Sequence, residues 1–358
     1  MRNIAAHNLY LPHALQNYVD LVMRFVIWLM RDVAYHPRGY YRLARTLAQR
    51  YEVEVWGRPM PPSALEGPLR SEVEPSIWQA LCEVPKTPNI TVHYLHFLPP
   101  RPQGRLIVCD PLGLAYAALL GVRPHLWDVW EPYAANYTWD PIYTPFQRWV
   151  RRLLWAGLAP LRRWPRAFTL AEYAYAGLTP PERSFFLPNA FVPVEDLPPL
   201  LPSLRGAYAL YTGNIAPAWG LREVLQEALA RPHEPFVLAG SLKSQAIAQF
   251  IAEALQAHPR WLWVRSRFVP YPVIQNLQRY ASYLYAPYTP LPHLVGRLFG
   301  KFYEAAALNL PIVYPKKQSL IWDAFWARYQ RHHSPQLYWS YYQAELWKAL
   351  CQPSTPQG

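Results

Sequence analysis

The sequence has little of several features that mark well-known classes of protein. Its 358 residues contain only three cysteines, Cys82, Cys109 and Cys351, an odd number without paired spacing. This argues against a disulfide scaffold and a structural zinc site, and it suits a reducing compartment. No apolar run reaches the roughly 18–20 residues that a membrane-spanning helix needs, and no signal peptide is evident. We therefore expect a cytoplasmic protein without a membrane span.

Two ligand-binding signatures are also missing. No Gly-x-Gly-x-x-Gly follows an expected strand, which argues against a dinucleotide-dependent enzyme. No Asp-x-Asp triplet stands at the end of an expected strand, where its carboxylates would hold a divalent cation. The histidines are scattered, and no pair has metal-ligand spacing within a helix. The sequence therefore predicts no metal site and no organic cofactor.

Positive charge and aromatic rings are what the chain has in excess. The formal net charge is +12, distributed over both halves, which predicts an anionic partner such as a nucleotide, a phospholipid surface or a nucleic acid. Aromatic residues make up 15% of the chain, so we expect rings to remain for clefts and surfaces after two cores are filled. No RNA- or DNA-binding module is recognisable, so nucleic acid is not the expected partner.

Strand-like and helix-like runs alternate along the whole chain, which is the pattern of parallel sheets with crossover helices. A chain of 358 residues suits two such domains. The expected strands cover residues 25–30, 53–56, 90–97, 106–109, 126–129 and 167–170 in the first half, and 207–212, 236–239, 261–264, 283–286 and 312–314 in the second.

The predicted fold is α/β, with two doubly wound Rossmann-like domains that face each other across a cleft. Prolines are dense in residues 187–203, where they end helices and exclude central strands, so we expect an interdomain linker there. The predicted divisions are an N-terminal helical arm (1–22), a first domain (23–186), the linker (187–203), a second domain (204–330) and a C-terminal helix that returns toward the first domain (331–358).

Residues 300–313 form the most informative segment. Gly300 opens an expected helix that carries Lys301 and Glu304, and Pro311 ends the helix before the last strand. Free N–H groups and the positive end of the helix dipole favour an anion at such a helix start. The segment resembles the nucleotide-sugar-binding element of GT-B glycosyltransferases of the GT4-like branch (glycosyltransferase group 1), in the variant Lys-x-x-Glu-x-x-Ala-x-x-x-Pro-x-Val. By this resemblance, Glu304 holds the ribose hydroxyls of the donor, and Lys301 faces its diphosphate.

Other parts of the second half match the same family in order and spacing. Glycine turns after the strands 207–212 and 236–239 let the backbone approach a phosphate, because no Cβ is in the way. A loop after the strand 261–264 resembles the segment that flanks the nucleobase. The residues that the resemblance assigns to donor binding are Gly213, Asn214, Ser241, Lys243, Phe268, Val269, Gly300, Lys301 and Glu304.

The chain departs from the family pattern at two places. Many members carry a second glutamate eight positions upstream, where this chain has Gly296. Many also place an arginine and a lysine after the first glycine turn, whereas residues 214–219 contain no base, which leaves Lys301 and Lys243 to face the diphosphate. These departures leave a second interpretation open, a catalytically silent GT-B-like protein that binds a partner or a membrane surface.

Glycosyl transfer also requires that the acceptor hydroxyl lose its proton and that the leaving diphosphate be stabilised. Asp110 is the first candidate for the base because it ends the strand 106–109, and ligands in open α/β sheets bind outside the carboxyl ends of the strands. Asp128 and Glu131 are the next candidates. Asp110, which precedes a proline, and Glu131 also suit the structural task of capping a helix.

Six arginines and three tryptophans lie between Arg148 and Arg166, and residues 141–171 contain no acid. Arginine and tryptophan at helical spacing suit a helix that lies on an anionic membrane. They also suit a domain-surface helix whose rings pack inward while the arginines stay in water.

The resemblance implies a hexosyltransferase-type enzyme that is retaining and metal-independent. It would move a sugar from a nucleoside-diphosphate donor to a carbohydrate or lipid-linked acceptor in polysaccharide or glycolipid biosynthesis. The first domain would then be the acceptor side and the second would bind the nucleotide sugar. The expected place of action is the cytoplasm, peripherally at the inner face of the membrane.

Overall fold

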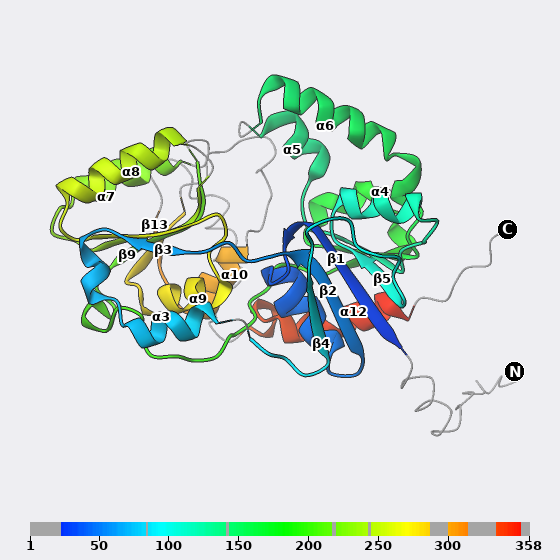
Figure 1. Cartoon of the computed structure of the whole chain (residues 1–358), viewed down its shortest axis with the longest axis horizontal. Coiled ribbons are helices and arrows are strands. Elements are labelled where there is room, and N and C mark those ends of the chain that lie inside the picture. The colour runs from blue at the N-terminus through cyan, green and yellow to red at the C-terminus, as the bar shows by residue number, and fades with distance from the viewer. Residues whose placement is uncertain are drawn as a thin grey trace, which may run out of the picture.

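The computed structural model describes residues 23–83, 85–140, 143–216, 220–242, 245–286, 300–313 and 334–351. These residues form two lobes side by side, each built around one β-sheet (Figure 1). The expected N-terminal arm (1–22), Lys243 and Gly296 lie outside the described residues.

The sheet of the first lobe contains seven strands within the described ranges, in the order β4-β2-β1-β5-β6-β7-β8, and all neighbours are parallel. β6 and β7 are buried along their whole length, as expected for a parallel sheet packed on both faces. Every strand expected in this half is present. The bounds are β1 (Arg24–Val33), β2 (Glu52–Arg58), β4 (Ile90–Tyr94), β5 (Arg105–Val108), β6 (Leu126–Val129), β7 (Ala167–Leu170) and β8 (Ser184–Phe186).

The second sheet, counted over the same described ranges, has six strands in the order β13-β12-β9-β10-β11-β3. All pairs are parallel except β3 with β11. The strands expected in the second half are present. Their bounds are β9 (Ala209–Ile215), β10 (Phe236–Leu242), β11 (Trp261–Ser266), β12 (Tyr283–Tyr285) and β13 (Ile312–Val313), joined by the short β3 (Ala64–Glu66).

Helices connect the strands in both lobes (Figure 1). In the first lobe, β1 is followed by a π-helix, η1, and then by α2. The same lobe also contains α4, α5 and α6. No helix in the described part of the chain has the length and apolar character needed to cross a bilayer. The bounds are η1 (Pro37–Ala44), α2 (Arg45–Leu47), α4 (Pro111–Leu119), α5 (Tyr133–Trp139), α6 (Pro145–Gly157), α3 (Pro75–Cys82), α7 (Leu221–Leu229), α8 (Gln245–Ala257), α9 (Tyr271–Tyr280), α10 (Gly300–Ala307) and α12 (Trp339–Leu350).

One segment of the first half belongs to the second lobe. β3 pairs antiparallel with β11, and Leu69, Val73 and Leu81 join the core of the second lobe. This corrects the predicted span of the first domain, 23–186, which is interrupted at this segment. The physical reason is that β3 covers the edge of β11, which would otherwise present unpaired backbone groups.

The last helix returns to the first lobe. α12 contacts β7 and β8, and Leu346 and Leu350 are buried in the core of that lobe. Its first residue, Trp339, donates from Nε1 to Thr46 Oγ1 at 2.9 Å. The C-terminal end of the chain therefore stabilises the lobe that the N-terminal half builds.

The linker after β8 is held by side chains from both lobes. From η1, Arg38 donates to the Leu187 carbonyl oxygen at 2.8 Å and Arg42 donates to the Ala190 carbonyl oxygen at 2.7 Å. From α9, Gln275 donates to the Val192 carbonyl oxygen at 2.5 Å. Because these bonds hold the backbone at several points, this part of the linker is an anchored strap.

Candidate functional site

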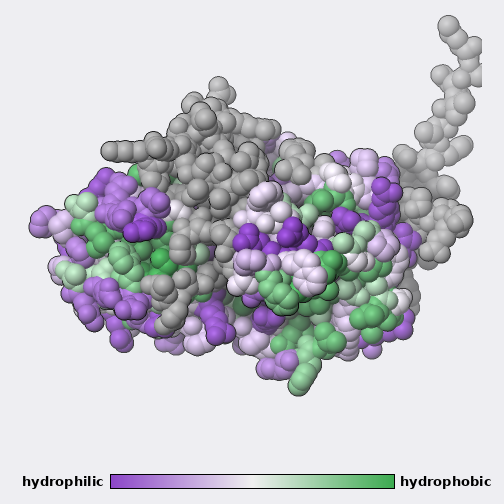
Figure 2. All heavy atoms as spheres, turned by 90° about the horizontal axis from the view of Figure 1, so that it is seen from above, coloured by the Kyte–Doolittle hydropathy of each residue, from purple (hydrophilic) through white to green (hydrophobic). Residues whose placement is uncertain are grey.

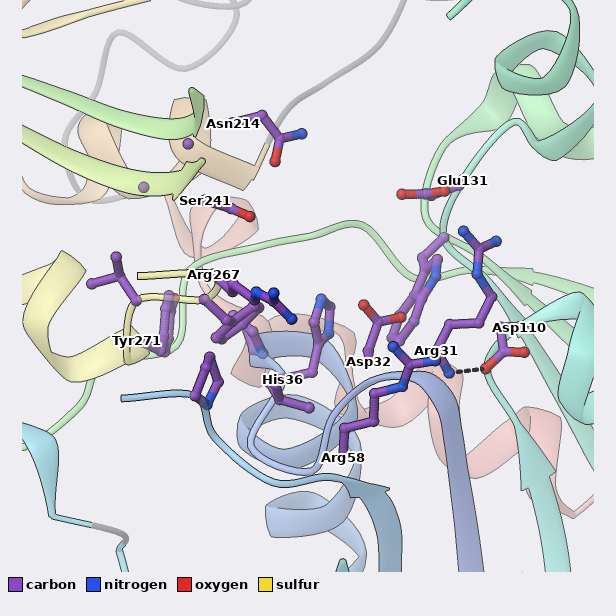
Figure 3. Close-up of a pocket in the computed structure, with 18 of the residues that line it drawn as sticks. Arg31, Asp32, His36, Arg58, Asp110, Glu131, Asn214, Ser241, Arg267 and Tyr271 are labelled. Carbon is purple, nitrogen blue, oxygen red and sulfur yellow. Dashed lines mark hydrogen bonds between the residues drawn. The ribbon is translucent and has the colours of Figure 1, made fainter. Parts of the chain in front are cut away.

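A cleft of about 1320 Å³ lies between the lobes. Its walls come from the ends of β1, β5 and β6 on one side and from the ends of β9, β10 and β11 on the other (Figure 3). The strand order reverses once in each sheet, between β1 and β5 in the first and between β9 and β12 in the second. Open α/β sheets bind ligands at the carboxyl ends of the strands beside such a reversal. Two doubly wound parallel sheets thus face each other across a cleft, as the sequence predicted. This is the GT-B architecture.

Lys301, near the start of α10, lies beside the turn at the end of β9. Its Nζ donates to the Thr212 carbonyl oxygen at 2.5 Å, and a Cβ added to Gly213 would lie 3.0 Å from the same nitrogen. Gly213 has φ of +125°, a conformation that favours glycine. Burial lowers the pKa of Lys301 to about 8, although Glu304 acts in the opposite direction. The predicted pairing of the glycine turn with this lysine is therefore present in the geometry.

A second glycine permits the close approach of β9 and β10. An added Cβ on Gly240 would lie only 1.8 Å from the Gly213 carbonyl oxygen, so no other residue fits without moving a strand. Asn214 and Ser241 follow these glycines, and their side chains point toward the cleft (Figure 3). The sequence therefore placed both residues correctly on the cleft wall.

Glu304 lines the cleft from the middle of α10 and is only 7% exposed. Its Oε2 accepts a hydrogen bond from Gln278 Nε2 at 3.0 Å. Burial, and then the neighbouring Glu304 carboxylate, raise the pKa of the Tyr271 hydroxyl. Gly300 does not line the cleft but packs against the linker, where an added Cβ would lie 3.4 Å from the Asn189 Cβ. The carboxylate is thus held inside the cleft, away from open solvent.

The loop after β11 contributes an aromatic contact between the lobes. Phe268 and Val269 line the cleft, as the sequence predicted. The Phe268 ring centre lies 5.9 Å from the ring of His36, which in turn lies 4.5 Å from the ring of Trp130. Burial, and then the nearby Arg42 cation, lower the pKa of His36 to about 3, so the imidazole is neutral at physiological pH. His36 therefore acts as an uncharged ring between the two lobes.

Asp110 reaches the cleft, but backbone N–H groups occupy both of its oxygens. Oδ1 accepts from the Gly113 N–H at 2.9 Å, which caps α4, and Oδ2 accepts from the Met30 N–H at 2.9 Å. Burial raises its pKa to about 6, although the hydrogen bond from Gly113 works against this shift. The helix-capping interpretation of Asp110 is therefore correct, and it leaves the carboxylate tightly held.

The other two acidic candidates differ in access to the cleft. Asp128 is fully buried, with Arg38 donating to both of its oxygens at 2.6 Å and Thr169 donating at 2.6 Å to one of them. It does not line the cleft, which corrects the prediction that it is a candidate base. Glu131 does line the cleft, and its Oε2 accepts from Asn136 Nδ2 at 3.3 Å. Of the three candidate acids, Glu131 is thus the one that lines the cleft without backbone N–H groups bonded to both of its oxygens.

The chain was compared with known families, curated proteins and solved structures. No family model matches the sequence, and no curated protein matches it. Solved structures with a similar outline include UDP-N-acetylglucosamine 2-epimerase from Rickettsia bellii, with 9% identity, coverage of 92% of this chain and 96% of that chain, and a TM-score of 0.47. A second is the catalytic domain of starch synthase IV from Arabidopsis thaliana, with 11% identity, coverage of 84% of each chain and a TM-score of 0.44. A third is a UDP-glucosyltransferase from Polygonum tinctorium, with 11% identity, coverage of 82% of this chain and 79% of that chain, and a TM-score of 0.45.

Several residues of the GT-B cleft were not singled out from the sequence. They lie at or just after the ends of β1, β2 and β11, or at the start of α9, and in Figure 3 their side chains point into the space between the lobes. The signal that could have found them is their position, because polar residues directly after strands at a reversal of strand order face the ligand site. These residues are Arg31, Asp32, His36, Arg58, Arg267 and Tyr271.

Proposed function

We propose that the protein transfers a glycosyl group from a nucleoside-diphosphate sugar. The observation that carries this proposal is the arrangement of Gly213, Lys301 and Glu304 on one wall of the cleft. The lysine and the glycine turn offer positive charge and close backbone approach to a diphosphate. The buried carboxylate of Glu304 offers two acceptor oxygens for vicinal hydroxyls of a ribose. Ribose and diphosphate are adjacent parts of the nucleotide in such a donor.

Each group has a distinct part in the proposed reaction. Lys301, in the first turn of α10, stabilises the charge that develops on the departing diphosphate. Phe268 and Val269 form the wall for the nucleobase. Glu131, across the cleft, takes the proton of the acceptor hydroxyl. The hydroxyl oxygen bonds to the anomeric carbon from the same face that the departing diphosphate leaves, so the bond to the diphosphate breaks as the new glycosidic bond forms. Asp110 orients this side of the cleft through its bonds to the ends of β1 and α4.

Retention of the anomeric configuration and independence from metal are further parts of the proposal, carried over from the sequence resemblance. In the described residues, no cluster of three or more His, Cys, Asp or Glu side chains is arranged to hold a metal ion. The anomeric proton signals of the product, followed by NMR during turnover, report retention or inversion. Turnover with and without EDTA reports the need for a metal.

A panel of nucleoside diphosphates and nucleotide sugars tests donor binding by thermal denaturation. A donor at about 100 times its Kd should stabilise the folded chain by about 2.7 kcal/mol. Glu304→Ala and Lys301→Ala should remove this stabilisation, whereas Lys348→Ala should keep it, because Lys348 is exposed and pairs with Glu345 on α12. The proposal fails if no compound stabilises the protein, or if Glu304→Ala responds like the wild type.

Release of the nucleoside diphosphate separates an enzyme from a silent binding protein. The wild type should release it when a donor and an acceptor are both present. Glu131→Gln should bind the donor as the wild type does and lose turnover. Binding without release, across a broad panel of acceptors, would instead support the silent GT-B-like protein.

We also propose that the first lobe docks on an anionic membrane surface through α6. Phe146 is 70% exposed and Trp149 is 53% exposed on this helix, whose arginines include Arg148 and Arg152. Most other exposed large apolar side chains of the described residues are also on this lobe. Figure 2, seen from the side on which α6 lies, has hydrophobic patches next to hydrophilic ones on the first lobe. A surface of this kind suits the boundary between lipid headgroups and acyl chains.

Co-sedimentation with vesicles tests the membrane surface. The wild type should bind vesicles of phosphatidylcholine and phosphatidylglycerol in roughly equal parts, and binding should weaken as salt rises, because the arginines act through screened charge. Phe146→Ser combined with Trp149→Ser should weaken binding by about tenfold, because two rings no longer enter the interface. Phe250→Ser, on α8 of the second lobe, is the matched control and should bind as the wild type does. Equal binding by all variants would contradict docking through α6.

A further inference from the structure

Two arginines of the first lobe that line the cleft converge on one tyrosine, Tyr137. Arg31, near the end of β1, donates from Nη1 to the Tyr137 hydroxyl at 3.2 Å. The guanidinium carbon of Arg151, on α6, lies 5.6 Å from the centre of the Tyr137 ring and 4.2 Å from the centre of the Tyr143 ring. Arg31, Tyr143 and Arg151 all line the cleft. Two cations from segments far apart in sequence are therefore brought together on the acceptor wall.

These arginines are held by aromatic groups and not by carboxylates. Over the described ranges, neither guanidinium forms an ion pair with an aspartate or glutamate. Glu131, which lines the same wall, accepts a hydrogen bond from the Asn136 amide. A guanidinium stacked on a ring keeps its N–H groups directed sideways, where a ligand can accept from them. Two like charges held this way are stabilised when an anion lies between them.

We infer that Arg31 and Arg151 form a subsite for a phosphate ester carried by the acceptor. The inference rests on the proposed function, in which the donor binds to the opposite wall, with Gly213 and Lys301. A phosphate ester presents several oxygens and can accept from two guanidinium groups at once, whereas one arginine satisfies a carboxylate in a bidentate pair. In Figure 3 Arg31 extends toward Glu131, across the cleft from Asn214 and Ser241. The phosphate would therefore be held beside the group that receives the acceptor hydroxyl.

The place of Arg151 on α6 connects this subsite with the exposed surface of the same helix. Arg151 lines the cleft, whereas Phe146, Trp149 and Leu154 of α6 are exposed to solvent. A lipid phosphate could thus enter along the helix, and a soluble sugar phosphate could enter through the open cleft. Both sources share the chemistry of a phosphate ester, and the test has one arm for each.

The soluble arm measures binding of glucose 6-phosphate, glucose and glucuronate to the full chain by calorimetry. Glucose 6-phosphate should bind more tightly than the other two, and Arg31→Gln and Arg151→Gln should each raise its Kd at least about tenfold, because a charged hydrogen bond is lost. Arg152→Gln, an exposed neighbour on α6, should leave this Kd unchanged. UDP, measured on the same variants, reports the donor wall and should bind equally to all of them.

The lipid arm measures binding to phosphatidylglycerol vesicles and to phosphatidylcholine vesicles. Arg31 lies on the cleft wall and not on the exposed face of α6, so a loss of phosphatidylglycerol binding in Arg31→Gln places the headgroup in the subsite. The inference is overturned if neither phosphate source responds to Arg31→Gln and Arg151→Gln, or if glucuronate binds as tightly as glucose 6-phosphate. If no nucleoside diphosphate of the donor panel binds while a phosphate probe still responds to both arginines, the proposed function fails and the anion subsite stands.

Discussion

Replacing Arg38 by methionine should lower the free energy of unfolding by about 3–5 kcal/mol, because it leaves a buried carboxylate without its cation. Arg38 is 1% exposed, and Asp128, to which it donates twice, is fully buried. The same substitution removes the bond to the Leu187 carbonyl oxygen, so the linker loses one of its attachments. Urea denaturation of the purified protein measures the change.

An exposed ion pair of the same lobe provides the control. Arg24 pairs with Glu52 and Glu54 at the start of β1, where its side chain is 41% exposed. Arg24→Met should cost far less stability than Arg38→Met, because water screens such pairs. The double variant Arg38→Met with Asp128→Leu should regain much of the loss, because no buried charge remains. If Arg38→Met were as mild as Arg24→Met, the pair with Asp128 would not be buried as described.

Donor affinity should fall steeply in alkaline solution. Only the protonated form of Lys301 attracts a diphosphate, and burial lowers its pKa to about 8. The Kd for a nucleotide sugar should therefore stay constant below about pH 7 and rise about tenfold per pH unit above pH 8, reaching roughly 100-fold at pH 10. Titrations at a series of pH values measure the profile.

Two variants show whether Lys301 causes this profile. Lys301→Arg keeps a permanent positive charge, so its Kd should change little between pH 7 and pH 10. A slope that remains in Lys301→Arg would belong to another group, such as the nucleobase. Stability should change in the opposite sense from affinity. Because burial lowers the pKa of Lys301 below its value in the unfolded chain, the wild type without ligand should gain stability relative to Lys301→Met as pH rises above 8.

Local patterns in the sequence predicted the strands, and the family resemblance singled out the residues of the proposed donor wall, because both rest on neighbours in the chain. The strands of parallel sheets are buried on both faces, so their apolar runs stand out from the polar segments between them. Lys301 and Glu304 lie on one short helix with a glycine before it and a proline after it, and these features are visible without knowledge of the fold. The turn at Gly213 needs a positive φ, which glycine readily adopts.

Other features depend on partners that are distant in the sequence. Asp128 and Glu131 are three residues apart, but Asp128 lies inside β6 and faces Arg38, whereas Glu131 follows the strand and reaches the cleft. Nothing near residue 128 reveals a cation that is 90 positions away. Likewise, residues 64–82 form only a short strand and short helices, so local patterns do not show that they pair with β11. Arg31 and Arg58 come directly after or close to the ends of predicted strands. Whether they line the cleft depends on which strands are neighbours in the sheet, and the sequence does not show this.

The segment of the N-terminal half that contains β3 and α3 packs on the second lobe, so the two lobes cannot be produced separately by cutting the chain once. A cut in the proline-rich strap would not release two autonomous halves, because the C-terminal fragment would lack the strand that shields the margin of β11. The N-terminal fragment would lack α12 and would carry Leu69, Val73 and Leu81 with nothing to pack on. Each half, produced alone, would expose a surface that its counterpart normally hides, and such surfaces favour aggregation.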